Sequence, residues 1–254
     1  MITDPLFYLV AIPAVLIVGI SKGGMGGGLG ILAVPIMSLV IPPFQAAAIM
    51  LPILCVMDLV GMWGFRGTYD KTNLKIILPA AIVGIVIGAL SFHSLSEDQI
   101  KLIIGFVATS FTLNFAYRKW RKTPEKVTHA NVTQGSFWGM MAGFTSFSVH
   151  AGGPPINIYL LPQKMDKTLF VGTTIIFYAV VNYTKLIPYA YLGLLEAGNL
   201  MTSLMLLIFA PVGVYSGMYL HKHISDFWFY LICYSLLFVT GLKLIYEGSH
   251  HFFL

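Results

Sequence analysis

The sequence predicts an all-α integral membrane protein, and its composition and apolar runs both support this fold class. Of its 254 residues, 57% are hydrophobic and only 10% are charged, whereas roughly 25% of the residues in a soluble domain are charged. Runs long enough to cross a bilayer recur along the whole chain. They are continuously apolar, which excludes a transmembrane β-barrel. The net charge of +5 does not indicate nucleic-acid binding, because the basic residues lie in short connections between the runs.

Two regions do not fit as ordinary spans, and we expect each to form a re-entrant hairpin of two half-helices. The first, 6–41, has a first arm that ends at Ile20 and a second that resumes at Leu29, with the break in the glycine tract "SKGGMGGG". The second, 135–162, breaks at "HAGGPP". Each arm has about 11–15 residues, fewer than the roughly 20 that an upright span needs. The expected organisation is a first repeat (1–117, with spans 44–65, 76–92 and 102–117), a basic linker (118–134) and a second repeat (135–254, with spans 169–195, 199–220 and 227–246).

The basic connections predict the orientation of the chain. Arg66 to Lys75, the linker 118–134, Lys164 with Lys167, and Lys222 should all face the cytoplasm by the positive-inside rule. Both chain ends then face outward. Three crossings place the second half upside down relative to the first, which makes an inverted repeat. Many transporters have this architecture, with the substrate near the midplane. Residues 1–21 contain no Lys or Arg, so we expect no cleaved signal peptide.

The hairpin tips have the chemistry of an anion site. Half-helices that begin near Gly28 and Gly153 would present unpaired N–H groups and positive dipole ends to one point. Glycine allows the backbone to approach a ligand closely. Hydroxyl and histidine side chains near the tips add donors, and Lys22 adds a full charge. The candidate contacts from the two tips are Ser21, Lys22, Gly24, Gly27, Gly28, Ser146, Ser148, His150, Gly152 and Gly153.

Other interpretations of the same residues remain open. Lys22 would lie at the cytoplasmic surface if 6–41 formed two tilted spans. Glycines four residues apart also allow helices to pack closely, and we expect this role for the pairs Gly84/Gly88, Gly139/Gly143 and Gly213/Gly217. The "GGMGGG" tract is denser than packing requires, and there we expect a break in the helix.

Asp58 and Lys185 lie inside apolar spans, where an ionisable side chain is costly and usually faces a cavity or a partner. We interpret Lys185 as an anion contact and Asp58 as its partner or as a proton acceptor for coupling. The alternatives are a structural ion pair and a snorkelling lysine. His150 could carry protons near neutral pH, although a hydrogen-bonded tip histidine is an equal alternative.

Four motifs together resemble the TauE/SafE family, the sulfite-exporter-like group of membrane transporters. They are "GGMGGGLGILAVP", "GGPPINIYLL", "NYTKLIP" and Asp58 with Gly61, and they cover nearly the whole chain. The resemblance implies transport of small sulfur-containing anions, such as sulfite or organosulfonates, without ATP hydrolysis. It also adds Asn182 and Lys185 of "NYTKLIP" to the candidate substrate contacts.

The predicted function is therefore secondary transport across a cell membrane. The expected direction is export, and the expected location is a bacterial inner membrane. An anion channel of the same fold is the first alternative. A membrane enzyme or scaffold of sulfur metabolism is the second, although the sequence shows no catalytic constellation. It also contains no Walker motif or metal-ligand cluster, so we expect no enzymatic activity and no cofactor. The expected partners are the anion and the lipid bilayer. The sequence does not determine the oligomeric state, and a homodimer is one alternative.

Overall fold

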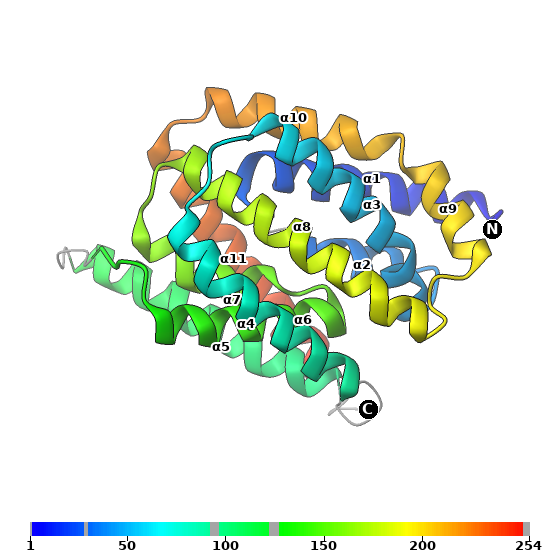
Figure 1. The fold of residues 1–254 in the computed structure, drawn as a ribbon, viewed down its shortest axis with the longest axis horizontal. Helices are drawn as coiled ribbons and strands as arrows, with labels where there is room; N and C mark the ends of the chain where they lie inside the picture. Colours follow the sequence, from blue (N-terminus) through cyan, green and yellow to red (C-terminus); the bar gives the residue numbers. More distant parts are fainter. Residues whose placement is uncertain (1, 28–29, 92–96, 122–126, 251–254) are drawn as a thin grey trace.

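A computed structural model describes residues 2–27, 30–91, 97–121 and 127–250, and within these ranges the secondary structure is helical (Figure 1). The elements in chain order are α1 (Pro5–Met25), η1 (Gly30–Leu32), α2 (Ala33–Met37), α3 (Pro43–Gly64), α4 (Lys71–Leu90), α5 (Glu97–Trp120), α6 (Val132–Val149), α7 (Gly153–Leu160), η2 (Leu161–Gln163), α8 (Lys167–Tyr191), α9 (Ala197–Leu206), α10 (Phe209–His223) and α11 (Asp226–His250).

Among the described helices, five are long and apolar enough to cross a membrane: α1, α3, α4, α8 and α11. α9 and α10 form a sixth candidate span, bent by 43° at its break. These spans confirm a multi-pass helical membrane protein. α5, which we expected as a full span, is 24 residues long but is not among the apolar candidates. α3 and α8 are the most buried of the five, and they position the candidate site.

The four basic connections lie together at one end of the molecule (Figure 1). The backbone N–H of Thr128, after α5, donates to the carbonyl of Pro162, before α8. The ammonium of Lys167 at the start of α8 donates to the carbonyl of Ile224, between α10 and α11. The start of α1 and the end of α11 lie toward the opposite end. This arrangement agrees with the orientation that the basic connections predict.

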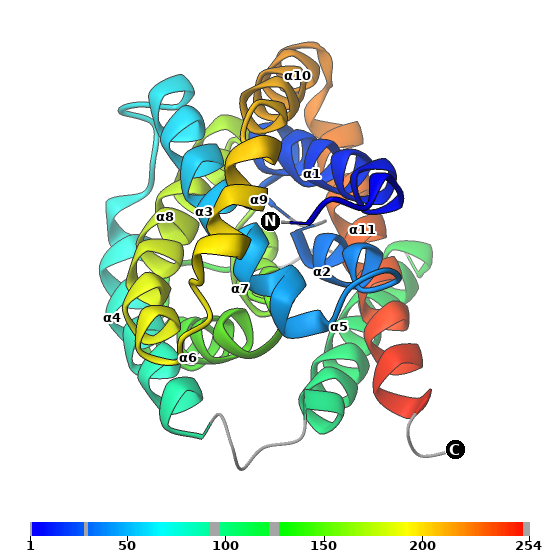
Figure 2. The same cartoon turned by 90° about the vertical axis from the view of Figure 1, so that its right-hand side faces the viewer.

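Close helix pairs surround the two buried helices, with α1 beside α10, α4 beside α6 and α5 beside α11 (Figure 2). Glycines form the first two contacts. A Cβ added to Gly139 would lie 2.8 Å from the carbonyl oxygen of Ile77, and one added to Gly213 would lie 3.0 Å from the Cα of Gly19. The glycines expected to pack are confirmed in that role: Gly84, Gly88, Gly139, Gly143, Gly213 and Gly217.

The first break lies inside the predicted glycine tract, but the helix before it ends later than expected. α1 continues through the glycine tract to Met25, and the chain turns at Gly26 and Gly27, whose φ angles are 66° and 74°. The expected end near Ile20 is wrong because the glycines pack against α10. A Cβ on Gly24 would lie 2.7 Å from the carbonyl oxygen of Gly217. Tertiary packing therefore overrides the low helix propensity of glycine.

The half-helix expected to begin near Gly28 also differs. Gly28 itself lies outside the described residues, and the chain resumes as the η1 turn and the five-residue helix α2. Pro35 inside α2 lacks an N–H group, which disfavours a longer helix there. The second tip is as expected, because α6 ends at Val149 and α7 begins at Gly153.

The span expected at 199–220 is interrupted at Leu207 and Ile208, between α9 and α10. Pro211 explains the position of this break. Its ring clashes with the carbonyl four residues earlier, that of Leu207, and it has no N–H to donate to that carbonyl. The helix over 199–220 is therefore not continuous, although α9 and α10 together remain one candidate span.

Candidate functional site

One face of α8 carries the polar side chains at the centre of the bundle. Tyr178, Asn182, Lys185 and Tyr189 follow one another at spacings of four, three and four residues, so they form a single stripe on the helix. All four side chains are buried. The stripe meets α3 and the two chain breaks, after α1 and after α6.

The first cluster joins Lys22, Asp58 and Asn182, which come from α1, α3 and α8. The ammonium of Lys22 forms an ion pair with Oδ1 of Asp58, and it lies 3.5 Å from the carbonyl oxygen of Leu54. The side-chain amide of Asn182 donates to Oδ2 of Asp58 at 2.7 Å. Both carboxylate oxygens are thus engaged, and the three side chains are buried. A buried charge needs such partners.

The second cluster surrounds Lys185, whose side chain is completely buried. Its ammonium donates to the hydroxyl of Ser146 at 3.0 Å and to the carbonyl of the same residue at 3.2 Å. It also lies 3.1 Å from Nδ1 of His150. Among the described residues no carboxylate lies within ion-pair distance of Lys185. We expected Asp58 to be the partner of Lys185 or a proton acceptor, whereas the direct partner of Asp58 is Lys22.

His150 connects the second break to α8. It ends α6 with a φ of 53°, a left-handed conformation that is uncommon outside glycine. A charged Lys185 can only donate, so Nδ1 of His150 accepts and the neutral ring carries its proton on Nε2. Nε2 lies 3.2 Å from the hydroxyl of Tyr189, which donates to the carbonyl of Phe147. The ring therefore extends the hydrogen-bond network of Lys185 along α8.

Tyr178 is a candidate that the sequence analysis missed. Its hydroxyl is buried and has no hydrogen-bond partner among the described residues. The ammonium of Lys22 lies 5.5 Å from the ring centroid, within the range of a cation–π contact. A Cβ on Gly27 would lie 2.8 Å from Cε2 of the ring. Its position four residues before Asn182 on the same helix face could have revealed it.

The other residues predicted to contact the anion have structural roles, either at one of the two chain breaks or in the packing of helices. The carbonyl of Ser21 accepts from the N–H groups of Gly26 and Gly27 and so fixes the first break. The hydroxyl of Ser148 donates to the carbonyl of Phe144 within α6.

Two glycines of the predicted set lie in close contacts between elements. Gly24 lies between α1 and α10, away from the stripe on α8. A Cβ on Gly152 would lie 3.0 Å from Cβ of Ser146, so this glycine allows the second break to close against α6. Gly153 is the first residue of α7.

A helical bundle that holds ionisable side chains among its spans is typical of membrane transporters. Comparison with protein families also indicates a membrane transporter, and it identifies a particular family. The sequence model described as "Sulfite exporter TauE/SafE" matches residues 11–244. The chain therefore belongs to the TauE/SafE family, and membership implies a membrane transporter of sulfur-containing anions. The corresponding comparisons find no match among curated proteins and none among solved structures.

Proposed function

We propose that this chain is a secondary transporter that exports sulfite or a small organosulfonate across a bacterial inner membrane. The anion binds between Lys185, Lys22 and the two chain breaks. Ser146, His150 and Asn182 orient these charges, and the backbone of Gly27, Gly152 and Gly153 lines the approach.

The observation that carries this proposal is the environment of Lys185. A lysine at the centre of a span costs roughly 2.5–3.5 kcal/mol on insertion scales, and the partners of Lys185 in the described structure are neutral. Lys22, by contrast, already has the carboxylate of Asp58. A sulfur oxyanion would supply the negative charge that Lys185 lacks. Its oxygens would accept from the ammonium and from nearby hydroxyl groups.

The proposal includes an inverted repeat, which matched hydrogen bonds at the two breaks support. The N–H groups of Gly26 and Gly27 donate to the carbonyl of Ser21. The N–H groups of His150 and Ala151 donate to the carbonyl of Thr145 in the same way. Each member of the second set lies 124 residues after its counterpart. The helix contacts are reciprocal as well, because α1 packs on α10 as α6 packs on α4.

The depth of the Asp58–Asn182 contact supports a site near the midplane. Asp58 is fifteen residues past the first residue of α3, and Asn182 is fifteen residues past the first residue of α8. α3 and α8 begin at opposite ends of the molecule (Figure 1). The contact therefore lies about 22 Å along each helix from opposite faces. Equal depths from the two ends of the molecule support a position of this contact near the midplane.

Asp58 is the coupling residue in this proposal. While it is ionised, it holds Lys22 in the ion pair. A proton on Asp58 removes that attraction and frees the ammonium of Lys22 for the anion. Binding of the proton and binding of the anion then favour each other at one site.

Efflux of radiolabelled sulfite from proteoliposomes tests the proposed function. We expect saturable efflux that exceeds the efflux from empty liposomes, and loss of most of this flux in Lys185→Gln. Unlabelled sulfite on the opposite side should accelerate the exchange of label, as a carrier requires. Flux that rises linearly with concentration and shows no such acceleration would indicate an anion channel. The absence of sulfite and sulfonate flux would contradict the proposal.

A further inference from the structure

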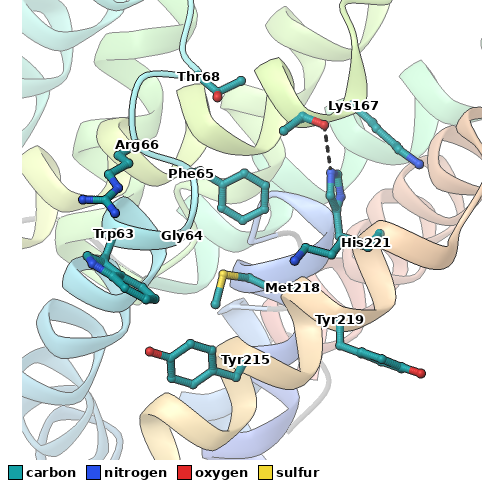
Figure 3. Close-up of a pocket in the computed structure, with 12 residues that line it drawn as sticks. Trp63, Gly64, Phe65, Arg66, Thr68, Lys167, Tyr215, Met218, Tyr219 and His221 are labelled. Atoms are coloured by element: carbon teal, nitrogen blue, oxygen red, sulfur yellow. Dashed lines mark hydrogen bonds between the residues drawn. The ribbon is translucent and has the colours of Figure 1, made fainter.

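A cationic pocket lies at the end of the molecule that the basic connections predict to be cytoplasmic. It has a volume of about 680 Å³ and is formed by the end of α3, the connection to α4, the start of α8 and the end of α10. Figure 3 shows Arg66 and Trp63 on one side, His221 on the other, and Phe65 and Met218 between them. Since a water molecule occupies about 30 Å³, the volume equals that of roughly twenty waters. A small anion can therefore enter with much of its hydration shell.

The charges of this pocket favour an anion. Arg66, Lys167 and Lys222 line it together with His221, and none of its described lining residues is acidic. Lys167 is partly neutralised by Asp226, whose Oδ1 lies 3.8 Å from its ammonium. In the described part of the chain, Arg66 and Lys222 have no carboxylate within ion-pair distance. The guanidinium of Arg66 instead lies 5.6 Å from the ring centroid of Trp63.

His221 connects the pocket wall to the helix that carries Lys22. Its Nδ1 lies 3.1 Å from the carbonyl oxygen of Gly24 near the end of α1. A carbonyl can only accept, so Nδ1 carries the proton. The other ring nitrogen lies 3.3 Å from the hydroxyl of Thr168, another lining residue. Gly24 is two residues from Lys22, which places the pocket next to the last turn of α1.

We propose that this pocket is a vestibule where the transported sulfur oxyanion binds before it reaches the central site, with Arg66 and Lys222 as its main cationic contacts. The inference rests on the proposed function. Two other accounts of the same charges exist, namely retention of basic residues for membrane topology and binding of an anionic lipid headgroup. The exposed rings of Trp63 and Tyr219 favour binding of a lipid headgroup, because exposed tryptophan and tyrosine rings are enriched at the membrane interface.

Uptake of radiolabelled sulfite into inverted membrane vesicles tests the vestibule, because these vesicles present the predicted cytoplasmic face to added substrate. We expect Arg66→Gln and Lys222→Gln each to raise KM about two- to fivefold, as loss of a solvent-exposed charge contact does. The maximal rate should not change. The matched control is Lys75→Gln, which removes an exposed charge from α4 outside the pocket. Its KM should equal that of the unmodified chain.

Three outcomes would overturn the inference, and they differ in what else they imply. Saturable sulfite uptake with the same KM in the Arg66, Lys222 and Lys75 variants would refute the vestibule and leave the proposed function intact. The measurement is repeated in proteoliposomes of phosphatidylcholine with and without phosphatidylglycerol. A KM effect that needs phosphatidylglycerol would assign the pocket to a lipid headgroup. Absence of saturable uptake in the unmodified chain would overturn the proposed function and the vestibule together.

Discussion

The side-chain amide of Asn182 donates a 2.7 Å hydrogen bond to the carboxylate of Asp58, and this contact joins α8 and α3, the two most buried of the five long apolar helices. The other oxygen of the same carboxylate holds Lys22. Asp58 thus links α1, α3 and α8 at one point. Mutation can measure how much each charge of this link contributes to the stability of the fold.

We expect Asp58→Asn to lower stability by about 3–5 kcal/mol, because it leaves the ammonium of Lys22 buried without a counter-charge. The double variant Lys22→Met with Asp58→Asn should recover much of this loss, since both charges are then absent. Thermal unfolding in detergent compares Asp58→Asn, Lys22→Met and the double variant with the unmodified chain. A double variant that loses at least the sum of the single losses would contradict this account of the pair.

Tyr178→Phe should weaken sulfite binding about three- to tenfold without lowering stability. The hydroxyl has no partner in the described structure, so the unliganded fold loses no hydrogen bond, whereas the anion loses a donor. Tyr189→Phe is the control, because its hydroxyl donates to Phe147 and its removal should lower stability. Unchanged affinity in Tyr178→Phe would show that the hydroxyl does not reach the substrate.

Gly143→Ala should destabilise the protein by about 1–3 kcal/mol, since the new methyl group would collide with the backbone of Ala81 on α4. Gly30→Ala is a suitable control because, apart from its chain neighbours, no described residue has an atom within 4 Å of an added Cβ there. Comparison of the two unfolding temperatures tests the helix contact. Equal temperatures would indicate that α4 and α6 do not pack this closely.

Cysteines introduced at Thr128 and Ser249 should react with a membrane-impermeant thiol reagent from opposite faces of the membrane. Thr128 lies with the basic connections and Ser249 at the end of α11, toward the other end of the molecule. The native cysteines, Cys55 and Cys233, are buried and should react little. Labelling of both introduced cysteines from the same face would refute the predicted orientation.

The residue patterns predicted the fold class and the second break well, because they depend on local properties. Continuous apolar runs identify spans, and "HAGGPP" combines glycine with prolines that cannot continue a helix. The first helix was predicted to end too early, since the helical state of Gly23 and Gly24 depends on contact with α10. Pro211 carried a local signal for the break between α9 and α10, but it lies inside an apolar run that suggested one span.

The composition of the candidate site was predictable, whereas its pairing was not. Charge inside an apolar span identified Asp58 and Lys185, and the glycine tract identified Lys22. Which lysine meets Asp58 depends on the direction of α1 beside α3, and no spacing in the sequence contains that information. The unpartnered hydroxyl of Tyr178 is likewise a property of the packed bundle, because tyrosine in an apolar span is unremarkable by itself.

Ligand-induced stabilisation tests the central claim that a sulfur oxyanion pairs with Lys185. A ligand that binds only the folded state at a hundred times its Kd stabilises that state by about 2.7 kcal/mol. We therefore expect saturating sulfite to raise the Tm of the purified unmodified chain and of the Lys75→Gln control by several degrees, and to leave the Tm of folded Lys185→Gln unchanged. An equal rise in Lys185→Gln would contradict the account.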